Sequence, residues 1–235
     1  MRKYASVFAL YTRSTVFFTL GVTLLGGAAQ FLLLWLHMRS AAPALPELCI
    51  PGSGAGIALL ISFLLLTAAL CLPGATPGTA NTIKRLQIGE RGTFMMHAGV
   101  CAAAYLFFWA AQIAVYTGFC LYFIKARPSL AGEQALFLAS FRSSLFHSLL
   151  PLRDTALWVR NALFIVSLSL VCAETPWLAR RRMYSFTGVP AAALVCVFFV
   201  RGLDDRMKLA PAVMLLIAVC GKLFYDFYMA GGDDA

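Results

Sequence analysis

Six apolar runs, separated by short polar or charged segments, dominate the pattern of this sequence. They cover residues 14–36, 56–73, 96–124, 156–174, 183–200 and 209–229. A helix needs about 20 mostly apolar residues to cross about 30 Å of hydrocarbon, and each run is close to or above that length. The pattern therefore predicts an all-α, polytopic membrane protein in which residues 1–235 form a single transmembrane domain with about six helices.

Three connecting segments have patterns of their own. Residues 1–13 carry apolar side chains at helical spacing among three basic ones, which predicts an N-terminal helix lying in the membrane interface. The same spacing in residues 133–150 predicts an external amphipathic helix. Residues 37–55 contain three prolines and two glycines, and we expect them to form a loop.

Composition supports the membrane class. Hydrophobic residues make up 61% of the chain, charged residues only 12%, and the mean hydropathy is +0.81. The formal charge is +9, but the Lys and Arg lie mostly between the apolar runs. They therefore indicate topology and contacts with lipid headgroups, and not nucleic-acid binding.

The positions of the basic residues predict an orientation. With six crossings, the N-terminal segment, residues 82–91 and residues 180–182 share one face, and dense clusters of cations favour the cytoplasm. We expect a multi-pass protein of the bacterial plasma membrane with cytoplasmic N- and C-termini. A cleaved signal peptide is an alternative for the basic start, but the first apolar run extends well beyond the usual length.

Little in the sequence indicates catalysis or cofactor binding. The seven cysteines are scattered without a CxxC pair, and the three histidines do not face one another across the predicted bundle as haem ligands would. There is no Walker A motif, so ATP hydrolysis through a P-loop would need a partner. We expect no enzyme activity, no cofactor and no metal site.

The segment between the second and third runs, residues 82–91, is the main candidate for a partner contact. It is short, polar and charged, as a segment that docks in a cleft of a soluble partner must be. The candidate docking residues are Lys84, Arg85, Leu86, Ile88, Glu90 and Arg91. The basic run Arg180, Arg181 and Arg182 is a candidate second contact on the inner face. Both sets are equally consistent with topology-determining charges and headgroup binding.

Three polar residues are candidate intramembrane contacts. Gln112 lies near the middle of the third run, where a hydrogen bond to a neighbouring helix is favoured over a contact with substrate. Arg160 would have to extend to the outer surface or pair inside the bundle. Asp226 follows Lys222 by four residues, which favours an ion pair on one helix face.

The basic N-terminal segment, the six runs and the loop sequence Thr82-Ile83-Lys84-Arg85-Leu86-Gln87-Ile88-Gly89-Glu90-Arg91 together resemble permease subunits of ABC transporters of the ABC-2 type. The resemblance covers the whole chain in topology but only about ten residues in motif. It implies a permease homodimer or heterodimer that is driven by a P-loop ATPase subunit seated on this loop. Lipid, peptide or drug export would be the usual activity.

The chain also departs from that family. Family members commonly carry a re-entrant external element between the fifth and sixth spans, whereas residues 201–208 are too few for one. The long external insert lies instead between the third and fourth runs. A non-transporting membrane scaffold or assembly factor is therefore the alternative function.

Overall fold

The computed structural model describes residues 2–40, 46–72, 89–128, 135–152, 154–181, 187–200 and 208–231. All regular structure in these ranges is helical. The helices are α1 (Arg2–Ser40), α2 (Pro46–Gly52), α3 (Ala55–Cys71), α5 (Glu90–Ala126), α6 (Ala135–Arg142), α7 (Ser144–Leu149), α8 (Thr155–Arg180), α9 (Gly188–Val200) and α10 (Ala210–Gly231). The all-α prediction is confirmed.

Four helices are long and apolar enough to cross a membrane. The qualifying stretches are Ser6–Ser40, Glu90–Ala126, Thr155–Ala179 and Ala210–Tyr228. Helices α3 and α9 are also apolar, but they have only 17 and 13 residues. At 1.5 Å per residue they are about 25 and 20 Å long, short of a full hydrocarbon layer. The structure thus supports a membrane protein with at least four candidate spans, where the sequence predicts six.

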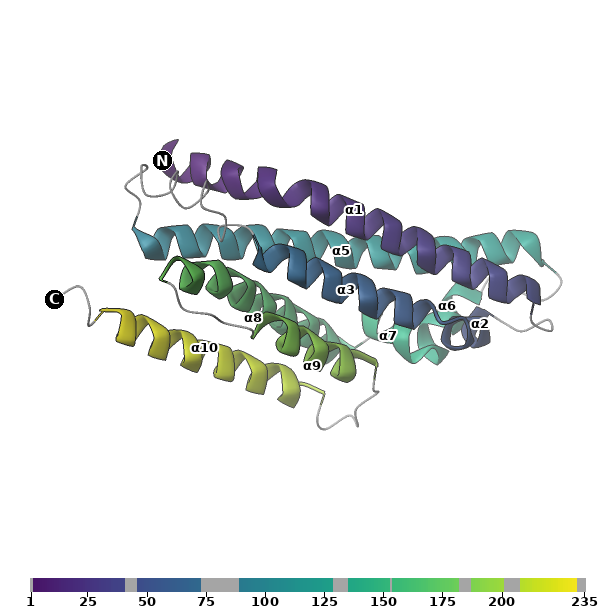
Figure 1. The fold of residues 1–235 in the computed structure, drawn as a ribbon. Helices are drawn as coiled ribbons and strands as arrows, with labels where there is room; N and C mark the ends of the chain where they lie inside the picture. The colour runs from purple at the N-terminus through teal and green to yellow at the C-terminus, as the bar shows by residue number, and fades with distance from the viewer. Residues whose placement is uncertain are drawn as a thin grey trace.

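The apolar helices α1, α3, α5, α8, α9 and α10 run side by side, and each runs opposite to the one before it in this order along the chain (Figure 1). As a result, the starts of α1 and α5 and the ends of α8 and α10 lie at one end of the bundle, which we call the termini end. The short helices α2, α6 and α7 gather at the opposite end, which we call the cap end. This alternation places the start of α1 and the end of α10 on the same side of the bundle.

The predicted N-terminal interfacial helix is not a separate element. Residues 2–40 form one continuous helix, because no proline occurs within it and no glycine precedes Gly21. Val7 and Tyr11 are fully buried, and the Tyr11 ring stacks on His97 of α5 with 4.4 Å between centroids. Packing against α5 therefore keeps the first turns of α1 in line with the rest.

The segment predicted as one external amphipathic helix contains two short helices. They meet at Ser143, whose hydroxyl accepts a hydrogen bond from the Phe146 amide at 3.4 Å and so caps α7. The apolar residues of α7 are buried within the protein, whereas Ser144 is exposed, so the apolar side of this helix packs against the bundle. The predicted loop over residues 37–55 is also partly helical, since α1 runs to Ser40 and α2 starts at Pro46, a favoured first residue of a helix.

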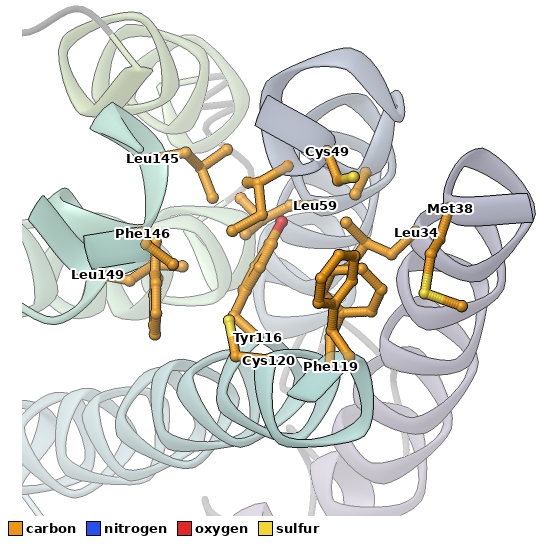
Figure 2. Close-up of a cluster of buried hydrophobic side chains, with 14 residues drawn as sticks. Leu34, Met38, Cys49, Leu59, Tyr116, Phe119, Cys120, Leu145, Phe146 and Leu149 are labelled. Carbon is orange, nitrogen blue, oxygen red and sulfur yellow. The ribbon is translucent and has the colours of Figure 1, made fainter. Parts of the chain in front are cut away.

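A buried cluster ties the cap helices to α1, α3 and α5 (Figure 2). Tyr116 extends from α5 into its centre with its hydroxyl toward Leu59 of α3, and its ring centroid lies 5.9 Å from that of Phe146. The labelled members are Leu34, Met38, Cys49, Leu59, Tyr116, Phe119, Cys120, Leu145, Phe146 and Leu149. Burial of these side chains fixes the cap on the long helices.

Candidate functional site

The predicted docking segment leads directly into α5 at the termini end. Lys84, Arg85, Leu86 and Ile88 lie outside the described residues. Glu90 and Arg91 do not lie in the loop as predicted, because they form the first turn of α5. A carboxylate at this position is favoured by the helix dipole, which explains why the helix begins at Glu90.

Glu90 also connects α5 to the end of α8. Its Oε2 accepts hydrogen bonds from Trp177 Nε1 at 3.2 Å and from Arg181 Nη2 at 2.6 Å. The Arg181 guanidinium lies 4.9 Å from the centroid of the Trp177 ring. We call these three residues the Glu90 junction. Glu90 is 55% exposed, so the ion pair itself contributes about 1 kcal/mol or less, and its main effect is to set position.

The Glu90 junction is anchored in the bundle by an aromatic cluster. Trp177 is buried, and its ring centroid is 4.6 Å from that of Phe227 on α10. Phe227 in turn contacts Phe94 of α5 edge-on, with 5.6 Å between centroids. The first turn of α5 is therefore held to both α8 and α10.

The basic run at the end of α8 is only partly within the described residues. Arg180 is the last residue of α8, Arg181 belongs to the Glu90 junction, and Arg182 lies outside the described part. Arg91 is exposed at the same end. Glu90 and Arg181, which the sequence placed in two separate candidate sets, are thus brought together.

A second polar group lies inside the bundle near the same end. The Glu174 carboxylate on α8 accepts hydrogen bonds from Lys222 Nζ of α10 at 2.5 Å and from Thr187 Oγ1 at 3.3 Å. Lys222 also pairs with Asp226 at 3.8 Å, the ion pair expected from their spacing. We call Glu174, Thr187, Lys222 and Asp226 the Lys222 cluster. It joins α8 and α10 to the residue that precedes α9.

Burial makes this cluster energetically important. The Glu174 side chain is 1% exposed, while that of Lys222 is 37% exposed. Removing one member of a buried ion pair costs about 3–5 kcal/mol, because the other charge is left uncompensated. Lys222 is partly exposed, so water can solvate its charge when Glu174 is removed. The cost of removing one member of this pair is therefore below that range.

Sequence reasoning did not select Glu174. The available indication was an acidic residue at the edge of an apolar run, which in a membrane protein is a candidate functional position. Its partner Lys222 lies 48 residues further along the chain, so the pairing could not be recognised from spacing.

Arg160 remains inside the bundle and does not extend to the surface. The residue is 2% exposed, and its Nε and Nη2 donate to Asn161 Oδ1 at 3.3 and 3.1 Å. Asn161 Nδ2 donates to the Ser148 carbonyl of α7 at 2.8 Å. Within the described residues, the Arg160 guanidinium therefore has a side-chain amide inside the bundle as its partner.

Gln112 is fully buried on α5. Neither its amide nitrogen nor its amide oxygen has a hydrogen-bond partner within the described residues. The predicted hydrogen bond to a neighbouring helix is therefore absent from this part of the chain. An unsatisfied buried polar group costs about 1–3 kcal/mol, so this position is unfavourable unless a further group binds to it.

At the cap end, Asp154 links the starts of α8 and α10. It caps α8 by accepting from the amides of Ala156 and Leu157, and its Oδ2 receives a hydrogen bond from Lys208 Nζ at 2.6 Å. The Lys208 ammonium lowers the pKa of Asp154 below its ordinary value, and the two amides act in the same direction against partial burial.

No metal centre is formed by the described residues, among which no three side chains of His, Cys, Asp or Glu are grouped as ligands would be. Comparison with protein-family models, with curated proteins and with solved structures found no match for this chain.

Proposed function

We propose that this chain is the membrane-spanning permease subunit of an ABC-type exporter of the ABC-2 type. In this proposal α3 and α9 complete six crossings of the bacterial plasma membrane, and both termini lie in the cytoplasm. A separate P-loop ATPase docks on the segment that contains Lys84, Arg85, Leu86, Ile88, Glu90 and Arg91. Two permease chains, identical or different, form the pore.

The Glu90 junction is the observation that carries the proposal. A docking segment can transmit movement only if it is attached to stiff elements. Here the segment ends on the first turn of α5, and Glu90 joins that turn to Trp177 and Arg181 at the end of α8. A displacement of the segment would therefore act on two long helices together.

The aromatic packing around the junction extends this link to α10. Phe94, Trp177 and Phe227 contact one another across α5, α8 and α10. The Lys222 cluster adds a polar connection between α8 and α10 next to them. These contacts support a unit of three helices that moves with the docked ATPase, while Arg180, Arg181 and Arg182 interact with the partner or with anionic lipid headgroups.

Affinity purification of the tagged chain in mild detergent tests this function directly. The wild type is compared with Leu86→Asp plus Ile88→Asp, and co-purifying proteins are identified by mass spectrometry. We expect a P-loop ATPase with the wild type and its loss from the double variant at equal membrane expression, because the new charges would disrupt an apolar contact.

The matched control is Leu138→Asp plus Leu152→Asp, which introduces the same charges at exposed leucines of the cap end. This control should retain the ATPase. If no ATPase accompanies the wild type, or if both double variants retain it equally, the docking role is wrong. A non-transporting scaffold or assembly factor is then the better description.

A further inference from the structure

Two cysteines from distant parts of the chain meet where α3, α8 and α9 pack together. Cys71 is the last residue of α3 and Cys172 lies on α8. Both are free thiols, and the Cys71 thiol donates a weak hydrogen bond to Cys172 Sγ at 3.8 Å. A disulfide holds its sulfurs at about 2.05 Å, so rotation of the two side chains toward each other would bring these sulfurs close to bonding distance.

The two thiols differ in their access to reagents. Cys172 is fully buried, whereas Cys71 is partly exposed. A small uncharged reagent that enters from the surface therefore meets Cys71 first. A buried cysteine without such access behaves as a small apolar side chain, so Cys172 is expected to react only through Cys71.

The Cys71 sulfur lies against the first turn of α9. A Cβ added at Gly188, the first residue of α9, would lie 2.7 Å from this sulfur, so a larger residue there would displace the thiol. The first amides of a helix have no partner inside the helix, and the helix dipole places positive charge at this end. Such surroundings stabilise a thiolate, which is the nucleophilic form of cysteine. This position makes Cys71 the attacking thiol of the pair.

A chain of hydrogen bonds orients the second thiol. Thr67 donates its hydroxyl proton to the Phe63 carbonyl at 3.0 Å, so the Tyr105 hydroxyl is the donor in its 2.9 Å contact with Thr67. The Tyr105 oxygen then accepts from the Cys172 thiol at 3.3 Å. Cys172 is thereby held with its proton toward Tyr105 and a sulfur lone pair toward Cys71, as an attack on Cys71 requires.

We propose that Cys71 and Cys172 form a redox site whose substrate is a small hydroperoxide. The Cys71 thiolate attacks one peroxide oxygen and the O–O bond breaks. With hydrogen peroxide, the leaving hydroxide takes up the proton that Cys71 released and becomes water, and Cys71 is left as a sulfenic acid.

Cys172 completes the reaction. Its sulfur attacks Cys71 Sγ, the S–O bond of the sulfenic acid breaks, and the leaving hydroxide combines with the Cys172 proton. One hydrogen peroxide is thus reduced to two molecules of water, while two thiols are oxidised to one disulfide. Exchange with a small thiol reductant restores both cysteines.

The disulfide joins α3 to α8, the helix whose end carries the Glu90 junction. The site goes beyond the proposed transport function, since the oxidation requires this chain alone. Failure to recover an ATPase would leave the redox site untouched, and absence of the disulfide would leave ATPase docking untouched.

Peptide mapping of the purified full-length chain by mass spectrometry tests this reaction. The reduced chain in maltoside detergent is treated with hydrogen peroxide, remaining thiols are blocked with a maleimide, and the digest is searched for cross-linked peptides. We expect one peptide pair, joined through Cys71 and Cys172, with loss of two of the seven free thiols and reversal by dithiothreitol. Protein unfolded in dodecyl sulfate before oxidation should show no preference for this pair.

Two variants separate the roles of the thiols. In Cys172→Ser, oxidation should stop at a sulfenic acid on Cys71, which dimedone traps. In Cys71→Ser, the buried Cys172 should remain a free thiol. Cys220→Ser is the matched control, because Cys220 is an exposed cysteine of α10. It should form the disulfide at the wild-type rate.

A wild-type chain that keeps both thiols free after peroxide treatment would overturn the proposal. So would a disulfide from Cys71 to Cys101, another buried cysteine of the same apolar cluster. Trapping of a sulfenic acid on Cys172 in Cys71→Ser would contradict the assigned order of attack. The peptide mapping uses the unmodified protein, so it is decisive even if a variant does not fold.

Discussion

Glu174 places a carboxylate among apolar side chains of α8, where only specific partners make it tolerable. Lys222 and Thr187 supply those partners from two other parts of the chain. The arrangement satisfies both Glu174 oxygens with donors, as a buried carboxylate requires. The Lys222 cluster thus acts as a clamp that holds α8 to α10. It lies near the helix ends that the proposed ATPase would move.

The strength of this clamp can be measured with Glu174→Gln, Lys222→Gln and the double variant. Each single change should lower the free energy of unfolding by about 1–3 kcal/mol, because it removes the short Glu174–Lys222 ion pair and leaves one of its charges behind. The double variant should lose less than the sum of the two, since the charges are removed together. Unfolding in detergent mixtures with increasing dodecyl sulfate provides the measurement.

Lys125→Gln is the control for loss of a positive charge, because Lys125 lies outside the cluster near the end of α5. It should change the free energy of unfolding little. Strictly additive losses from Glu174→Gln and Lys222→Gln would contradict the clamp.

The lowered pKa of Asp154 predicts that the fold loses stability as the pH falls. Its pKa is lowered in the folded protein, chiefly by the hydrogen bond from Lys208. Its contribution is therefore complete above the unfolded pKa of about 3.9 and is lost as the pH falls through the lower folded pKa. The stability difference between wild type and Asp154→Asn should shrink as the pH falls from about 5 toward the folded pKa.

Asp154→Asn preserves the helix cap, since asparagine is also a favoured capping residue, so the comparison isolates the charge. Melting temperatures at a series of pH values measure the effect. A difference that stays constant through this range would show that the Lys208 pair does not stabilise the fold.

Two of the polar residues that the sequence marked as unusual, Gln112 and Arg160, are buried, but their surroundings were not predictable. Gln112 and Arg160 stand out because they interrupt apolar runs. That Arg160 would pair with Asn161 next to a cavity depends on how α3, α5, α8 and α9 assemble. Such contacts arise from packing between segments that are distant in the sequence, so they cannot be predicted from a single sequence.

Among the elements, the close approach of α1 to α3 depends on Gly26. A Cβ added there would lie 2.7 Å from Ser62 Cβ and 2.2 Å from Ser62 Oγ. Gly26→Ala should therefore push the helices apart and lower the free energy of unfolding by about 1–3 kcal/mol, the usual cost of overpacking. A lower melting temperature of the purified variant would show this.

Gly21→Ala is the matched control on the same helix, because nothing lies within 4 Å of the added Cβ. Alanine favours helix over glycine by about 1 kcal/mol, so this variant should be as stable as the wild type or more so. Equal effects of both substitutions would mean that α1 and α3 are not in contact at Gly26.

The helical elements were easier to predict than their boundaries. The apolar runs located the long helices, since hydrophobic length is the dominant requirement of a membrane span. Their ends were misjudged where packing or the helix dipole extends a helix, as at Glu90 and along residues 2–13. The helix that starts at Pro46 was missed because the three prolines and two glycines of residues 37–55 are typical of a loop, although proline is tolerated in the first turn of a helix.

At the scale of the whole molecule, the bundle has two chemically different ends. The termini end carries the start of α5, the Glu90 junction and the ends of α8 and α10, whereas the cap end is closed by α2, α6 and α7 (Figure 1). An ATPase that docks at the termini end would act far from the cap and from Arg160. Movement would have to pass along α5 and α8, which together with α3 and α9 line a cavity of about 70 Å³.

This arrangement predicts that Ser40 and Arg91 lie on opposite faces of the membrane. Ser40 is the last residue of α1 and Arg91 the second residue of α5, and these helices of 39 and 37 residues are parallel neighbours. At 1.5 Å per residue each is more than about 55 Å long, compared with about 45 Å for a bilayer with its headgroups. Both residues are exposed and should project into water.

Cysteines introduced as Ser40→Cys or Arg91→Cys, with the seven native cysteines replaced by alanine, allow a labelling test with a membrane-impermeant maleimide. If the termini end is cytoplasmic, Ser40→Cys is labelled in intact spheroplasts and Arg91→Cys only after lysis. Labelling of both variants in detergent-denatured samples controls for expression. The reverse result would invert the orientation and remove the docking segment from the reach of a cytoplasmic ATPase, and labelling of both in intact spheroplasts would contradict a membrane crossing by α1 and α5.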